Sequence, residues 1–124
     1  FSAGGAVVMT VAYDKGDGDL NAADPADRLN GRPNFQMMVY PGGAPPETVP
    51  SDTPPAFLVH SADDPAVPVM NSIGYFKGLQ KNKIPVEMHI FQKGGHGYGL
   101  APNGGTQSSW PDLCIRWMKQ MGIF

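Results

Sequence analysis

Apolar and polar positions divide the chain into patterned segments separated by polar stretches rich in Gly and Pro. Residues 56–60 (AFLVH) are a continuous apolar run, which is typical of a strand covered on both faces. Residues 86–91 alternate and predict a second strand, whereas 68–82 predicts a helix. The apolar positions behind these two predictions are Val86, Met88 and Ile90, and Val69, Met70, Ile73, Phe76 and Leu79. Together the three segments form a βαβ unit, which implies parallel pairing of its strands.

The remaining apolar segments flank this unit. Residues 2–12 are apolar on nearly every face and predict a helix buried on a sheet, although their β-branched run also suits a strand. Residues 35–40 predict a strand, and the proline-rich 43–55 predicts an irregular excursion. A last helix is capped by Ser108 or Ser109. Its buried stripe is Trp110, Leu113, Trp117, Met118 and Met121. The order predicts an α/β fold with a mainly parallel sheet and flanking helices.

Composition removes several classes of function. The 124 residues carry a net charge of -2, without the basic cluster that nucleic-acid binding requires. No apolar run reaches the roughly 18 residues of a membrane span. The single cysteine, Cys114, forms no internal disulfide and lacks metal-site spacing. Glycine (16) and proline (13) are abundant but lie between patterned segments, so we expect a loop-rich rather than a disordered chain.

Two patterns that suggest metal sites fail on inspection. The Asp-rich segment 17–28 has the start of a calcium loop, but Ala22 stands where the sharp turn needs Gly, and Arg28 stands where a bidentate Glu belongs. His60 and His89 lie within strands, lack the spacing of a zinc site, and are interpreted as structural. We expect neither a metal nor another cofactor.

Candidate chemistry gathers after two neighbouring strands. In parallel α/β sheets, functional groups lie on loops at the carboxyl ends of strands. Residues 61–68 supply Asp64, with Asp63 as the alternative acid, and residues 92–100 supply His96. The acid and the imidazole are therefore expected within reach of each other.

A nucleophile precedes both in the chain. Phe1-Ser2-Ala3-Gly4 has the form of the nucleophile elbow G-x-S-x-G, with its first glycine just before residue 1. The small residues at 3–5 let a helix pack closely after a strained turn. The Ala3 amide at the helix amino terminus is the expected oxyanion donor.

The chain resembles acetyl-xylan-esterase-like and dienelactone-hydrolase-like members of the α/β-hydrolase superfamily. The stretches that carry the resemblance are 1–5, 24–29, 32–35, 40–42, 60–68, 71–72 and 94–100. It implies the carboxyl-terminal half of an α/β-hydrolase fold with the triad Ser2, Asp64 and His96. It also implies a serine esterase that acts on small-molecule or carbohydrate esters, above all short acyl esters such as acetyl groups on sugars.

The sequence also fits two other functions. A prolyl-oligopeptidase-type serine peptidase shares this catalytic half, and a truncated, inactive hydrolase is the third reading. The chain starts at Phe1 without Met or signal pattern, so residues 1–124 are expected to be a partial catalytic domain that lacks its amino-terminal half. Alone it is expected to be poorly folded or inactive. Localisation and oligomeric state are left undetermined, although the resemblance allows a secreted or periplasmic protein.

Two aromatic residues and two methionines complete the candidate site and core residues. Tyr98 and Trp110 either line the acyl or alcohol pocket or pack in the core. Met37 and Met38 are interpreted as core residues.

Overall fold

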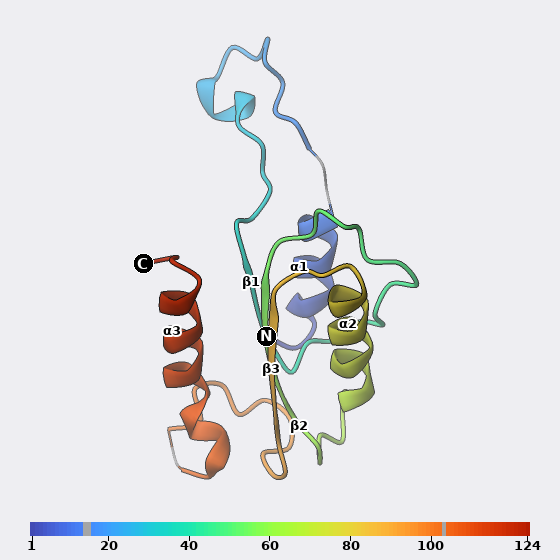
Figure 1. Ribbon diagram of the computed structural model, residues 1–124, viewed down its shortest axis with the longest axis vertical. Helices are drawn as coiled ribbons and strands as arrows, with labels where there is room; N and C mark the ends of the chain where they lie inside the picture. The colour runs from blue at the N-terminus through green and yellow to red at the C-terminus, as the bar shows by residue number, and fades with distance from the viewer. Residues whose placement is uncertain (14–15, 103) are drawn as a thin grey trace.

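Three parallel strands form the centre of the chain (Figure 1). The computed structural model describes residues 1–13, 16–102 and 104–124. Strands β1 (Gln36–Val39), β2 (Ala56–Ser61) and β3 (Val86–Phe91) lie in the order β1-β2-β3. The parallel pairing predicted for the βαβ unit is confirmed. Every residue of β2 is buried, because this strand is central and covered on both faces.

Helices cover both faces of this sheet. Helices α1 (Gly4–Tyr13) and α2 (Val69–Lys81) lie on one face, and α3 (Trp110–Gln120) lies on the other (Figure 1). The core under α1 and α2 contains Met9, Met38, Leu58, Tyr75 and Leu79, and the core under α3 contains Val39, Phe57, Val59, Cys114 and Trp117.

The segment 16–34 extends away from the sheet (Figure 1) and is largely exposed, as its polar composition predicts. It contains the short 3-10 helix η1 (Pro25–Arg28), whose first turn is capped by the Asp24 carboxylate.

Helix α1 begins two residues later than the sequence pattern predicts. The predicted helix started at Ser2, but the backbone of Ser2 has φ +47°. This left-handed conformation cannot continue into a right-handed helix, so the helix starts at Gly4. The preceding turn is therefore a separate feature that sets the direction of the Ser2 side chain.

Gly5 lets α1 approach the loop after β1. A Cβ added at Gly5 would lie 2.3 Å from Pro41 Cβ and 2.6 Å from Pro41 Cα. We expect Gly5→Ala to lower the free energy of unfolding by about 1–3 kcal/mol in urea denaturation, because backbone must move. Gly4→Ala is the matched control, since an added Cβ there meets no heavy atom within 4 Å. Equal stability of the two variants would contradict the close approach.

The buried face of α2 differs from the predicted stripe. Met70 is 60% exposed, whereas Ser72 and Tyr75 are buried. Polar anchors explain the rotation: the Tyr75 hydroxyl donates to Gln36 Oε1 at 2.8 Å, and Ser72 Oγ lies 2.7 Å from His60 Nδ1. A hydrophobic pattern does not register such contacts, since they bury polar groups against a partner.

Two predicted apolar positions of the outer strands are exposed instead. Met37 of β1 is 39% exposed and Ile90 of β3 is 46% exposed. The helices pack mainly over β2, so side chains on the outer strands are covered less completely. Met38, the other methionine interpreted as core, is buried.

Neither serine before α3 caps that helix with its side chain. A 3-10 helix, η2 (Thr106–Ser109), precedes α3, and the hydroxyls of Ser108 and Ser109 donate to carbonyls three residues back. Ser109 therefore stands at the N-cap position, as predicted, but neither hydroxyl caps the helix, because both are used within the 3-10 turn.

Candidate active site

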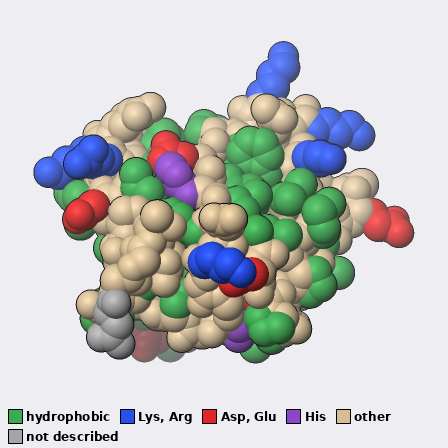
Figure 2. Space-filling view, turned by 90° about the horizontal axis from the view of Figure 1, so that it is seen from below, with side chains coloured by type: hydrophobic (Ala, Val, Ile, Leu, Met, Phe, Trp, Pro, Cys, Tyr) green, Lys and Arg blue, Asp and Glu red, His purple; other side chains and the backbone are tan. Residues whose placement is uncertain are grey.

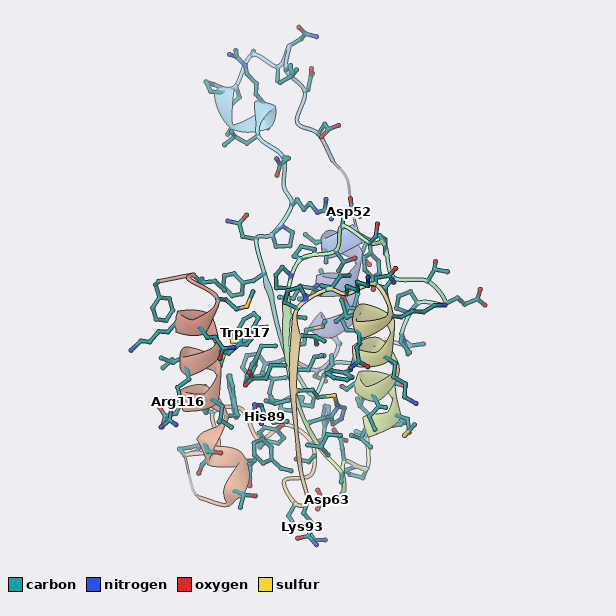
Figure 3. The ribbon with its side chains drawn as sticks, viewed as in Figure 1. Asp52, Asp63, His89, Lys93, Arg116 and Trp117 are labelled. Atoms are coloured by element: carbon teal, nitrogen blue, oxygen red, sulfur yellow. The ribbon has the colours of Figure 1, made fainter. Side chains whose placement is uncertain are left out.

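The loops after β2 and β3 meet at one end of the sheet. The backbone N–H of Gly95 donates to Asp63 Oδ1 at 2.9 Å, and Lys93 Nζ lies 3.7 Å from Asp63 Oδ2. Figure 3 shows Asp63 and Lys93 together at this end. Asp63, the alternative acid predicted from the sequence, thus joins the two loops through the backbone of the loop that carries His96.

The three predicted triad side chains are in contact with one another. Ser2 Oγ lies 2.8 Å from His96 Nε2, and His96 Nδ1 lies 2.7 Å from Asp64 Oδ2. The Asp64 side chain is buried, while that of His96 is 23% exposed. With Asp64 ionised, Nδ1 carries the proton that Oδ2 accepts, and Nε2 is left to accept the Ser2 hydroxyl proton.

Donors around Asp64 keep its carboxyl group ionised. Its Oδ1 accepts the backbone N–H groups of Ala66 (2.8 Å) and Val67 (2.9 Å). Burial acts to raise the pKa of Asp64, but the bonds from Val67, His96 and Ala66 outweigh burial and hold that pKa below its usual value. The group is therefore a carboxylate at neutral pH.

A tight turn holds Ser2 at the end of β1. Its N–H donates to the Val39 carbonyl at 3.2 Å, and its own carbonyl accepts from Gly5 (2.8 Å) and Gly42 (2.6 Å). A non-glycine residue at positive φ carries backbone strain that surrounding structure must hold. Here three backbone hydrogen bonds do so, and they aim Oγ at His96.

Aromatic side chains anchor the loop that carries His96. The Tyr40 ring centroid lies 4.8 Å from that of His96, and its hydroxyl accepts the Gly99 N–H at 3.0 Å. Trp110 Nε1–H donates to the Gly99 carbonyl at 2.9 Å. Trp110 is buried, and Tyr98 packs edge-on to Tyr40. Both residues therefore belong to the core cluster under α3.

Two residues at the site were not predicted from the sequence motifs. Tyr40 follows β1 directly and contacts the His96 ring. His60, interpreted only as structural, places Nε2 3.1 Å from Asp64 Oδ2. The signal for both was position, since each lies at or beside the carboxyl end of a strand, where side chains of parallel sheets converge.

The same end of the molecule faces the viewer in Figure 2. Hydrophobic side chains gather mainly on the right half of this face, a cationic and an anionic side chain stand together near its centre, and the other charged side chains lie mostly toward its rim. Across residues 1–13, 16–102 and 104–124, no group of three or more His, Cys, Asp and Glu side chains is arranged to hold a metal ion. Within the same ranges, no helix is long and apolar enough to cross a membrane.

The solved structures to which this chain is similar include esterases and other hydrolases. An acetyl ester-xyloside bifunctional hydrolase from Caldicellulosiruptor lactoaceticus is 34% identical, with a TM-score of 0.89 over 98% of this chain and 55% of that one. An alpha/beta hydrolase from a Medee basin deep-sea metagenome library is 29% identical, with a TM-score of 0.73 over 97% and 51%. A carboxylesterase from Lactobacillus plantarum, 24% identical with a TM-score of 0.77 over 100% and 57%, shares the fold.

Sequence comparisons point the same way. Endo-1,4-beta-xylanase B of Butyrivibrio fibrisolvens is 30% identical over an alignment 137 residues long, and the alignment covers 89% of this chain and 21% of the xylanase. The chain thus spans about half the length of the solved structures and about a fifth of the xylanase. Its parallel sheet and flanking helices fit the carboxyl-terminal half of an α/β-hydrolase fold. The prolyl oligopeptidase family matches residues 2–121, and the chain belongs to that family.

Proposed function

We propose that the protein is a serine hydrolase that cleaves carboxylic esters through an acyl-enzyme. The observation that carries the proposal is the continuous line of contacts from Ser2 Oγ through His96 to Asp64, at 2.8 and 2.7 Å. This is the order of a catalytic triad, in which a buried carboxylate orients an imidazole and the imidazole activates a serine hydroxyl.

In the proposed reaction, Ser2 Oγ attacks the ester carbonyl carbon while its proton passes to His96 Nε2. Asp64 accepts the Nδ1–H throughout and stabilises the imidazolium. The negative charge that develops on the carbonyl oxygen is placed near the Ala3 N–H at the start of α1. His96 then gives its proton to the departing alcohol, and water repeats the sequence to release the acid and free Ser2.

We further propose short acyl esters of carbohydrate, above all acetyl esters, as substrates. The support is the similarity to an acetyl ester-xyloside hydrolase along nearly the whole chain, together with the xylanase relative. We also propose that residues 1–124 are part of a larger catalytic domain, since the similar solved chains are about twice as long.

A proline-directed peptidase is the second candidate, and membership of the prolyl oligopeptidase family is what favours it. Both candidates use the same three side chains, so the choice rests on the substrate. An ester has a better leaving group than an amide, so a peptidase site can also cleave an ester. Ester hydrolysis alone therefore does not exclude a peptidase.

Substrate competition separates the two candidates. We expect the full-length protein to hydrolyse p-nitrophenyl acetate faster than p-nitrophenyl octanoate and to release acetate from acetylated xylan. A peptide with an internal proline should remain uncut under the same conditions, as followed by mass spectrometry. Cleavage after proline without acetate release from xylan would reject the esterase proposal in favour of the peptidase.

A further inference from the structure

His60 is a buried residue in contact with the Asp64 carboxylate. Its side chain is fully buried at the end of β2. Nε2 lies 3.1 Å from Asp64 Oδ2 and 3.1 Å from the Val67 carbonyl oxygen, and Nδ1 lies 2.7 Å from Ser72 Oγ. Both ring nitrogens therefore have partners, and one of those partners is the acid that contacts His96.

These partners determine where the proton of His60 resides. Nε2 faces two oxygens that only accept, a carboxylate and a backbone carbonyl, so Nε2 carries the hydrogen. Nδ1 is then an acceptor, and the Ser72 hydroxyl donates to it. Ser72, which α2 buries against β2, thus selects the tautomer that points a donor at Asp64.

Asp64 Oδ2 consequently receives two imidazole N–H groups, one from His60 and one from His96. Its other oxygen is occupied by the amides of Ala66 and Val67. The carboxylate is held in one rotamer by donors on both oxygens, so it cannot turn away from His96 without breaking several charge-assisted bonds.

We propose that His60 is a positioning residue for the triad, which orients Asp64 and limits how strongly that carboxylate attracts the proton on His96. The inference rests on the proposed function, because it assigns the role through the Ser2–His96–Asp64 arrangement. His60 touches no reacting atom itself; it acts through Asp64.

The charge state of His60 fits this role. Burial lowers its pKa, against the opposing effects of the Val67 carbonyl and Asp64, and the proximity of His96 lowers the pKa further. His60 is therefore neutral at neutral pH. A neutral donor shares the negative charge of Asp64 without cancelling it, so the charge remains available to the imidazolium that His96 becomes.

Three variants test the inference in the full-length protein. His60→Phe keeps a ring without a donor, His60→Gln restores an N–H near the Nε2 position, and Ser72→Ala frees the tautomer. His89→Phe is the matched control, because His89 is also a histidine within a strand. It lies in β3, away from Asp63 at the loop end (Figure 3), and its hydrogen-bond partner is Glu87.

We expect His60→Phe to lower kcat for p-nitrophenyl acetate by about 10- to 100-fold with little change in KM. The acid limb of its kcat/KM profile should move to higher pH, because Asp64 with one donor fewer stabilises the imidazolium more strongly. His60→Gln should recover most of both effects, Ser72→Ala should show a smaller version, and His89→Phe should match wild type. If His60→Phe does not fold, the Ser72→Ala and His60→Gln profiles carry the test.

Two results would overturn the inference. One is a folded His60→Phe variant with wild-type kcat and pH profile. The other is an equal loss in His60→Phe and His60→Gln with an unmoved acid limb, which is the signature of lost packing alone. The downfield proton resonance of the His96 Nδ1–H provides a readout without turnover. It should shift most in His60→Phe, less in Ser72→Ala, and little in His60→Gln and His89→Phe. If the wild-type protein hydrolyses no ester but His60→Phe still shifts this resonance, the proposed esterase function is rejected, while the positioning of Asp64 by His60 is retained.

Discussion

Replacing Ser2 with alanine is expected to lower kcat for p-nitrophenyl acetate by about 10⁶-fold, the loss seen when a triad nucleophile is removed. Without Oγ no acyl-enzyme forms, and water must attack the ester directly. The same variant should not be labelled by a fluorophosphonate probe, whereas the wild-type protein should carry the label on Ser2, as read by mass spectrometry.

The control for this variant is Ser109→Ala. Ser109 also precedes a helix, but its hydroxyl donates to the Thr106 carbonyl and is exposed, so wild-type turnover is expected. Turnover in Ser2→Ala equal to that of the control would remove the nucleophile from the proposal. Both variants should fold, since alanine at residue 2 can keep the backbone hydrogen bonds that Ser2 makes.

Asp64→Asn carries the second-largest expected effect, a loss of about 10⁴-fold in kcat. The asparagine side chain cannot satisfy both sets of donors that Asp64 accepts. In one orientation its NH₂ group faces His96 Nδ1, and in the other it faces the backbone N–H groups of Ala66 and Val67, so two donors meet in either case. The imidazole therefore loses the tautomer that accepts the Ser2 proton. Steady-state kinetics with the same ester measures the loss.

Asp63→Asn is the matched control for this prediction. Asp63 holds the Gly95 N–H, which an asparagine oxygen can still accept, so kcat should stay within a few-fold of wild type. The reverse ranking of the two variants would assign the acid to Asp63.

The free energy of unfolding of wild type and of Asp64→Asn should depend differently on pH. The pKa of Asp64 is lowered in the folded protein, so its contribution to the free energy of unfolding is fully present above the unfolded value of about 3.9 and is lost as pH falls through the folded pKa. The stability difference between wild type and Asp64→Asn should therefore shrink below about pH 4. Urea denaturation at several pH values measures it, and a gap that widens on acidification would contradict the assignment.

The amino-acid sequence by itself determined the elements and their order. The apolar run of β2 and the alternation of β3 set a buried strand beside its parallel neighbour, because burial on one or two faces leaves a periodic signature. Strand order then placed Asp64 and His96 at one end of the sheet, and the local motif around Ser2 named the third member. These are features of chain order and of local pattern.

Only the tertiary structure decided which side chains touch. The choice between Asp64 and Asp63 depends on loop geometry, since adjacent residues in a turn point in different directions. The role of His60 cannot be predicted from the sequence either. A single histidine in an apolar strand gives the same pattern whether it only packs in the core or also donates to a carboxylate. The rotated face of α2 has the same cause, because Ser72 and Tyr75 are buried by hydrogen-bond partners from other strands. Hydrophobic periodicity reports how much of a residue is covered, whereas directional contacts between distant residues exist only once the chain has folded.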